Sequence, residues 1–227
     1  LIVGGGIPLL MGPPRWARWV QTAWSSGVIF FARTVAGIEY EIRGKENLPD
    51  GAVIVASKHQ SAWETAMFPL ILDNPGIVAK KQLAKIPIYG WYFRKTDMIP
   101  IDRRGRAAAM RAMLRAAERI KGLGRPILIF PEGSRAEPGQ AAEYKVGAVG
   151  LYRHLKLPVV PVALNSGLFW PRKSFLKKPG KIVLEFLEPI DIGFGRDEFN
   201  VALRTTIEEG TMRLLKEGGF EDEKDLE

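Results

Sequence analysis

The sequence contains no cysteine and only two histidines, His59 and His154, among its 227 residues. Without cysteine the chain can form neither a disulfide nor a zinc–thiolate site, and it has no thiol nucleophile. Two histidines are also too few for a histidine-rich metal site. Any thioester used in the chemistry must therefore come from a separate carrier and be attacked directly.

Several catalytic and nucleotide-binding motifs are missing as well. The sequence has no G-x-S-x-G elbow, no P-loop, no G-x-G-x-x-G and no H-E-x-x-H, which leaves a serine hydrolase, a kinase, a dinucleotide enzyme and a zinc peptidase without support. The apolar segment before Pro13 and Pro14 is shorter than the roughly 20 residues that cross a bilayer.

The composition is that of an ordinary globular protein with a basic surface. Hydrophobic residues make up 46% and charged residues 26% of the chain, and 33 lysines and arginines exceed 25 acidic residues to give a net charge of +8. This length suits one domain with a full core. The excess positive charge predicts an anionic partner, which could be a phosphate-bearing substrate, an acidic membrane surface or nucleic acid.

Hydrophobic periodicity predicts an α/β fold: a single domain with a mixed, largely parallel central sheet flanked by helices. We expect an N-terminal apolar segment and amphipathic helix over residues 1–36, the main domain over 37–219 and an acidic tail over 220–227. The expected strands cover 38–43, 52–56, 77–79, 99–101, 127–130, 157–164 and 181–188, and the expected helices 15–36, 61–68, 106–121, 143–156 and 197–215.

One histidine stands where a buried strand should end. Residues 52–56 form a short apolar run, His59 follows it, and Ser61 and Glu64 fit the S-x-x-E capping box of a new helix. A loop His could fold back onto Glu64, which would fix its tautomer and leave the other ring nitrogen free to act as a general base. Two plainer interpretations remain open: Glu64 only caps the helix, and His59 is structural.

Four short motifs together resemble a known family. The segments are KHQSAWE at 58–64, IPIDRR at 99–104, FPEGSR at 130–135 and VVPV at 159–162. Their order and spacing resemble the four boxes of the glycerophospholipid acyltransferases, the PlsC-like 1-acylglycerol-3-phosphate acyltransferases. Glu64 stands where that family usually has Asp, and Ser134 where it usually has Thr, so the carboxylate and the hydroxyl are both kept.

The resemblance implies an enzyme that moves a fatty acyl group from a thioester to the sn-2 hydroxyl of lysophosphatidic acid, giving phosphatidic acid in phospholipid biosynthesis. It implies His59 and Glu64 as the catalytic pair. It also implies that the glycerol-phosphate site is lined by Arg103, Glu132, Gly133, Ser134 and Arg135.

The same resemblance implies no cofactor and no metal, with acyl-CoA or acyl-carrier protein as co-substrate, and no nucleic acid partner. It places the protein at the cytoplasmic face of the cell membrane, in contact with an anionic membrane surface. The rival hypotheses are another acceptor, such as glycerol-3-phosphate or a lyso-ornithine lipid, and a non-catalytic peripheral protein that binds anionic lipid.

Three further features bear on membrane and phosphate binding. The helix at 15–36 carries Trp16, Trp19 and Trp24, as an interfacial helix does, although the same stripe could pack on the domain. Lys80 and Lys81 follow a strand and could face a phosphate, but the pattern favours solvent. A basic-aromatic loop around residues 169–178 is compatible with a membrane or carrier surface.

Overall fold

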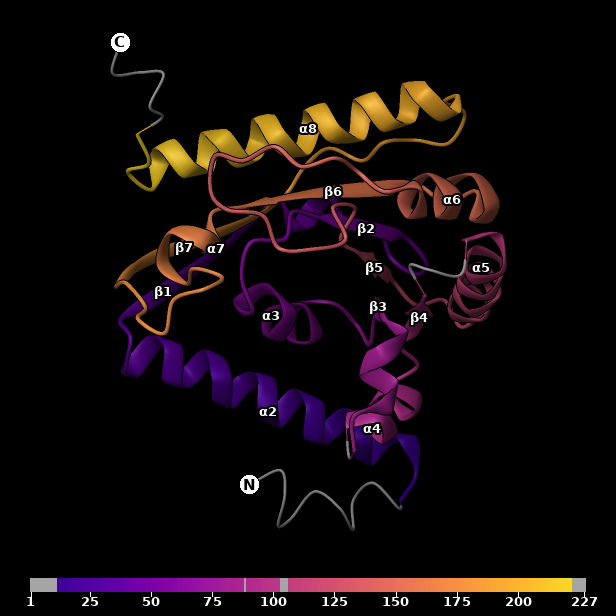
Figure 1. Ribbon diagram of the computed structural model, residues 1–227, viewed down its shortest axis with the longest axis horizontal. Coiled ribbons are helices and arrows are strands. Elements are labelled where there is room, and N and C mark those ends of the chain that lie inside the picture. Colours follow the sequence, from indigo (N-terminus) through magenta and orange to yellow (C-terminus); the bar gives the residue numbers. More distant parts are fainter. Residues whose placement is uncertain (1–11, 88, 103–105, 222–227) are drawn as a thin grey trace.

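The computed structural model describes residues 12–87, 89–102 and 106–221. Within this part of the chain, a seven-stranded sheet runs in the order β1-β7-β6-β2-β5-β3-β4 (Figure 1). All neighbouring strands are parallel except β6 and β7, which are antiparallel. The strands are β1 (Ile38–Arg43), β2 (Ile54–Ser57), β3 (Gly76–Lys80), β4 (Ile99–Ile101), β5 (Ile127–Ile129), β6 (Val159–Leu164) and β7 (Gly180–Phe186).

Helices cover both faces of this sheet (Figure 1). One face packs against α2 (Pro14–Thr34) and α3 (Trp63–Ile71), and the other against α5 (Arg106–Gly122), α6 (Val146–Leu155) and α8 (Arg196–Glu217). The expectation of a mixed, largely parallel sheet flanked by helices is thus confirmed. The short elements are η1 (Lys45–Asn47), η2 (Lys81–Lys85), α4 (Tyr89–Lys95) and α7 (Ser166–Phe169).

The two cores follow from the alternation of side chains along each strand. In β2, Val55 points into the core under α2 and α3, whereas Ile54 and Ala56 point into the core under α5, α6 and α8. Successive residues of a strand face opposite sides of the sheet, so a strand covered on both sides must be apolar throughout. Strand β6 and the apolar part of β2, Ile54 to Ala56, are fully buried for this reason.

Strand pairing brings the first and third sequence motifs, KHQSAWE and FPEGSR, to one edge of the sheet. Strands β2 and β5 lie side by side and parallel, with Ala56 opposite Ile129. The residues that follow them, starting with His59 and Phe130, therefore emerge together at the carboxyl edge of the sheet. Open α/β sheets place their ligands at this edge.

Helix α2 is amphipathic and lies across one side of the molecule (Figure 1). Its Ala17, Ile29 and Ala32 are buried, whereas several aromatic side chains remain exposed on its other side. None of the helices in the described residues is both long enough and apolar enough to span a membrane. The exposed aromatic side chains are Trp16, Trp19, Trp24, Phe30 and Phe31.

Candidate active site

Backbone hydrogen bonds hold His59 at the end of β2. The N–H of Lys58 donates to the carbonyl of Val162 at 2.9 Å, which continues the pairing with β6 by one residue. The N–H of His59 then donates to Oε1 of Glu132 at 3.1 Å, and its carbonyl accepts from the N–H of Ala136 at 2.8 Å. The loop after β5 thus binds both the N–H and the carbonyl of His59.

The imidazole of His59 faces the carboxylate of Glu64. Nδ1 of His59 lies 2.9 Å from Oε1 of Glu64, and the Glu64 side chain is completely buried. Because an ionised carboxylate only accepts hydrogen bonds, Nδ1 carries the proton and Nε2 is left as the basic nitrogen. The geometry is that of a histidine base with an orienting carboxylate.

Four other donors complete the surroundings of this carboxylate. The backbone N–H groups of Gln60 and Ser61 donate to Oε1 at 2.8 and 2.7 Å. The hydroxyls of Ser61 and Ser166 both donate to Oε2 at 2.8 Å. A buried charge is tolerated only when it is fully hydrogen-bonded, and Glu64 meets that condition.

The protonation of Glu64 follows from these contacts. Burial alone would raise the pKa of the Glu64 carboxyl, but the hydrogen bond from His59 and that from the Ser61 backbone outweigh it and hold the pKa below its ordinary value. Glu64 is therefore charged at neutral pH. A charged Glu64 stabilises the imidazolium that forms when His59 takes up a proton.

The start of α3 differs in detail from the expected capping box. The helix begins at Trp63, and its N-cap, Ala62, makes no side-chain cap hydrogen bond. The Ser61 hydroxyl accepts from the N–H of Trp63 at 2.9 Å, and Glu64 accepts from the N–H of Ser61. Glu64 thus satisfies backbone donors before the helix and holds His59 at the same time.

Phe130 supports the other face of the imidazole. The two rings stack with their centroids 4.0 Å apart and 21° between their planes, and Phe130 in turn meets Phe68 edge-on. The His59 side chain remains 15% exposed. The ring is therefore fixed in orientation but still reachable from the cavity that it lines.

The loop after β5 carries the FPEGSR motif to the same edge. Gly133 has a φ of 68°, a left-handed conformation that favours glycine, and its N–H closes a turn on the carbonyl of Phe130 at 2.9 Å. Ser134 is exposed, and both Ser134 and Arg135 line the cavity with His59. Arg103, the remaining implied phosphate contact, lies outside the described residues.

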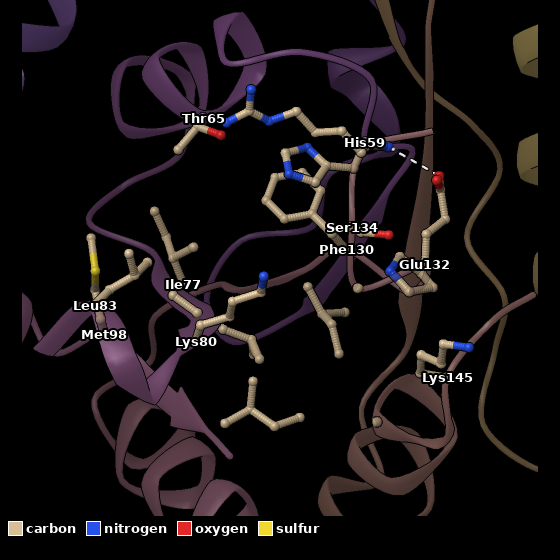
Figure 2. Close-up of a pocket in the computed structure, with 18 of the residues that line it drawn as sticks. His59, Thr65, Ile77, Lys80, Leu83, Met98, Phe130, Glu132, Ser134 and Lys145 are labelled. Atoms are coloured by element: carbon tan, nitrogen blue, oxygen red, sulfur yellow. Dashed lines mark hydrogen bonds between the residues drawn. The ribbon is translucent and has the colours of Figure 1, made fainter. Parts of the chain in front are cut away.

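Glu132 points away from solvent. Its side chain is fully buried, with Oε1 near the Lys58 ammonium at 3.5 Å, and Oε2 has no hydrogen-bond partner among the described residues. Burial raises the pKa of Glu132 to about 7, even though the Lys58 charge and the His59 N–H act in the opposite direction. The structure brings Glu132 to the site but places its carboxylate behind the backbone of His59 (Figure 2).

Lys58 anchors this region to α8. Its ammonium donates to both carboxylate oxygens of Glu208 at 2.8 Å and to the carbonyl of Gln140 at 3.3 Å, and the side chain is 1% exposed. The Tyr144 hydroxyl donates to Oε1 of Glu208 at 3.1 Å. A charged cluster thus lies on the far side of the chain from the imidazole.

The imidazole opens onto one large cavity of about 1660 Å³. Its apolar walls come from α2, α3, β3, α4 and α5. Figure 2 shows Ile77, Leu83 and Met98 together at one end of the pocket and His59, Phe130 and Ser134 at the other. A long apolar volume that ends at a polar, reactive group suits a lipid chain with its functional head at His59.

Basic side chains surround the polar end of this cavity. Arg135, Lys145, Arg172 and Lys173 line it, and so does Lys80, whose side chain enters the pocket from β3 (Figure 2). Lys80 is exposed, as the sequence favoured, and its side chain also lines the cavity. The feature of the sequence that indicated the cavity position is that Lys80 stands at the carboxyl end of a buried strand, where open sheets place their ligands.

Two contacts at the site, those of Ser166 and Phe130, carried no clear signal in the sequence, although Phe130 belongs to the FPEGSR motif. Ser166 follows β6, 102 residues after Glu64, and reaches the carboxylate only because β6 pairs with β2. Phe130 stands directly before the P-E-G-S-R segment but could equally have been core. Both become recognisable only when the edges of β2, β5 and β6 lie together.

Comparisons with known proteins agree with this geometry. A family model described as Acyltransferase matches residues 39–165, more than half of the chain. A crystal structure of the 1-acyl-sn-glycerophosphate (LPA) acyltransferase PlsC from Thermotoga maritima superposes with a TM-score of 0.72 over 88% of this chain and 80% of that chain. Its sequence is 24% identical, so the likeness concerns the fold.

Several curated proteins with similar sequences carry the same name. A 1-acyl-sn-glycerol-3-phosphate acyltransferase of Pseudomonas aeruginosa is 36% identical over 165 residues, which are 73% of this chain and 64% of that protein. Proteins of the same name from Saccharomyces cerevisiae and Limnanthes alba are 28% and 34% identical over 80% and 68% of this chain. The matched part spans only 60% and 56% of their lengths.

The buried ion pair of Lys58 predicts a strong dependence of stability on this side chain. Lys58→Met leaves Glu208 without its cation, and removal of one partner from a buried pair typically costs about 3 kcal/mol of unfolding free energy. Urea denaturation at pH 7 measures this loss. The control, Lys181→Met, breaks a pair with Glu41 that is 56% and 40% exposed, and should change stability by less than about 0.5 kcal/mol. Equal effects would contradict the role of Lys58.

The raised pKa of Glu132 predicts a loss of stability with rising pH. In the folded state this carboxyl titrates at about 7 instead of 4.5, so between these values the folded chain binds more protons than the unfolded chain. Stability falls across this window, by about 3 kcal/mol for this group. Glu132→Gln should flatten the pH dependence measured by urea denaturation between pH 5 and 7.5. The exposed Glu209→Gln should leave the dependence as it is in the unaltered protein.

Proposed function

The chain belongs to the acyltransferase family, and we propose that it transfers a fatty acyl group from an acyl thioester to the sn-2 hydroxyl of 1-acylglycerol-3-phosphate. The product is phosphatidic acid, made for phospholipid biosynthesis. The observation that carries this proposal is the imidazole of His59, held at 2.9 Å by a buried carboxylate where a lipid-sized cavity of about 1660 Å³ meets basic side chains.

In the proposed reaction, Nε2 of His59 removes the proton of the acceptor hydroxyl while the hydroxyl oxygen attacks the thioester carbonyl. Glu64 stabilises the imidazolium that forms. As the tetrahedral intermediate collapses, the C–S bond breaks and the proton passes from His59 to the departing thiolate. The acyl group goes directly to the acceptor, and no acyl-enzyme is formed. The rigid ring, stacked on Phe130, supports this step by orientation.

Phosphate recognition is assigned to the basic rim of the cavity. Arg135 can offer forked, charge-assisted hydrogen bonds to a phosphate, and Lys80 adds a second charge from the end of β3. The predicted contact of Arg103 joins them in this proposal. Ser134 offers a hydroxyl, and Gly133 allows the backbone to turn beside the headgroup. Glu132, behind His59, holds the loop in place.

The apolar part of the cavity is proposed to take an acyl chain. Its lining includes Val20 and Trp24 of α2 and Tyr92 of α4, so elements outside the four boxes complete it. The donor is proposed to be an acyl-CoA or an acyl-carrier protein, with no cofactor. The excess positive charge of the chain favours the approach of either anionic carrier.

We place the protein at the cytoplasmic face of the cell membrane, attached to an anionic lipid surface through α2. The exposed tryptophans Trp16, Trp19 and Trp24 support this placement, because indole rings favour the headgroup region of a bilayer. A lipid acceptor held in the membrane would then reach a cavity that α2 itself helps to line.

Release of free thiol from acyl-CoA in the presence of lysophosphatidic acid tests the proposed activity. Because the chain contains no cysteine, a thiol reagent detects only the released carrier. His59→Ala should lower kcat by at least about 100-fold, since the general base is lost. His154→Ala is the matched control and should retain activity, because that histidine is exposed and pairs with Glu118 on the surface. Substantial turnover by His59→Ala would remove this residue as the base.

Glu64→Gln separates the charge of this residue from its packing. The amide oxygen can still accept the three N–H donors at Oε1, and the amide N–H₂ can donate to the hydroxyls of Ser61 and Ser166, which rotate to accept. We therefore expect a folded protein with kcat reduced about 100-fold. Circular dichroism and the thiol assay measure the two effects. An unchanged rate would mean that Glu64 serves the backbone alone.

A further inference from the structure

The segment between α7 and β7 carries an exposed apolar tip within a basic loop. Residues 172–178, which we call the 172–178 loop, contain Arg172, Lys173, Lys177 and Lys178 and no acidic residue. Phe175 at the tip is 97% exposed and Leu176 is 76% exposed. Large apolar side chains held this far into solvent mark an interaction site.

Local hydrogen bonds build the tip. The N–H of Leu176 donates to the Ser174 hydroxyl at 3.1 Å, and the Lys177 ammonium donates to the carbonyls of Ser174 and Phe175 at 2.8 and 3.1 Å. The same ammonium lies 5.1 Å above the ring of Trp170, which packs against the core. The Phe175 and Leu176 side chains thus project from a supported turn instead of folding back onto the domain.

The loop also adjoins the carboxyl end of α2. The N–H of Gly180 donates to the carbonyl of Gly37 at 3.0 Å, and Pro179 packs so close to Gly37 that an added Cβ there would lie 3.1 Å from it. Figure 1 shows the connection between α7 and β7 at the end of the molecule where α2 ends. The exposed Phe31 and Val35 lie at that end of α2.

The base of the loop reaches the candidate active site. The Arg172 guanidinium donates to the carbonyl of Arg135 at 2.8 Å, and Arg172 and Lys173 both line the cavity that contains His59. A surface that received the tip would therefore also lie beside the polar end of the cavity.

We propose that the 172–178 loop is a second lipid-contacting element, which inserts Phe175 and Leu176 into an anionic bilayer while the net positive charge of the loop attracts the lipid headgroups. The combination of an apolar tip and flanking cations complements an acidic bilayer, whose apolar interior lies directly under a layer of negative charge. An acidic carrier protein would match the cations, but only a bilayer also offers a continuous apolar interior to both Phe175 and Leu176. This inference rests on the proposed function, because the bilayer is the source of the lipid acceptor.

Together with α2, the loop gives the protein two contacts with the same surface. Two separated contacts restrict how the domain tilts on a bilayer more than one helix does alone. The restricted orientation keeps the rim formed by Arg135 and Arg172 near the headgroups, so the acceptor phosphate meets these cations as it enters.

A fluorophore at the tip tests insertion independently of catalysis. Since the chain has no cysteine, Phe175→Cys introduces a single thiol that can carry an environment-sensitive dye. With phosphatidylcholine vesicles that contain phosphatidylglycerol, we expect a blue shift and brighter emission, and both should weaken in high salt. The matched control is Val201→Cys on α8, a position 64% exposed on the side of the sheet away from α2, which should show no shift.

Removal of the apolar tip tests its contribution to binding. Phe175→Ser with Leu176→Ser should weaken sedimentation with the anionic vesicles by at least about tenfold, because two large apolar side chains no longer leave water. Thiol release with a short-chain, monomeric lysophosphatidic acid should be unchanged, which also shows that the variant is folded. The double variant Ile192→Ser with Val201→Ser should bind vesicles like the unaltered chain.

Three results would overturn the proposal: no spectral change at position 175, equal changes at positions 175 and 201, or unaltered vesicle binding by the double variant. If the tip variant instead slowed turnover only with acyl-carrier protein, the loop would be a carrier-docking surface. Absence of thiol release by the unaltered chain would reject the proposed activity, but it would leave the vesicle results standing.

Discussion

The structure depends on one buried carboxylate, that of Glu64, which must keep its charge without water. Five donors meet its two oxygens: Nδ1 of His59, the N–H groups of Gln60 and Ser61, and the hydroxyls of Ser61 and Ser166. Loss of any one leaves a buried charge under-compensated, so the loop after β2, the start of α3 and the first residue of α7 are held in one arrangement. The geometry of the His59–Glu64 pair and the local stability of the fold thus arise from the same requirement.

The extended backbone at the end of β2 serves two functions because adjacent side chains face opposite sides. Lys58 points toward α8 and is bound by Glu208, whereas His59 points toward Phe130 and the cavity. The ion pair fixes the chain on the α8 side without entering the cavity that His59 lines. A shift of Lys58 would therefore move His59 as well, so the Lys58 cluster helps to position the imidazole.

The sequence predicted local features well because they depend on local physics. Apolar runs with turn residues around them placed all seven strands, and two of them, β1 and β4, match to the residue. The short helices α4 and α7 were missed, since Pro87 and the single turn at 166–169 leave no helical period to detect. At the site, the interval of five residues between His59 and Glu64 was enough to predict their contact. The contact of Ser166 with Glu64 depends on the pairing of β6 with β2, and strand order cannot be predicted from a local sequence pattern. The cavity likewise needs α2, α4 and β3 side by side.

Two buried carboxylates beside His59 show how the surroundings separate the behaviour of identical groups. Glu64 and Glu132 both contact His59, one at the ring and one at the backbone N–H. Hydrogen bonds to both oxygens outweigh burial and lower the pKa of Glu64, whereas Oε2 of Glu132 has no partner in the described chain, and burial raises its pKa to about 7. Only a carboxylate that remains charged across the working pH can stabilise an imidazolium, so the ring contact falls to Glu64. Glu132 can be neutral for part of the time without loss of its contact with His59, because this bond comes from the main chain and an oxygen of either form accepts it.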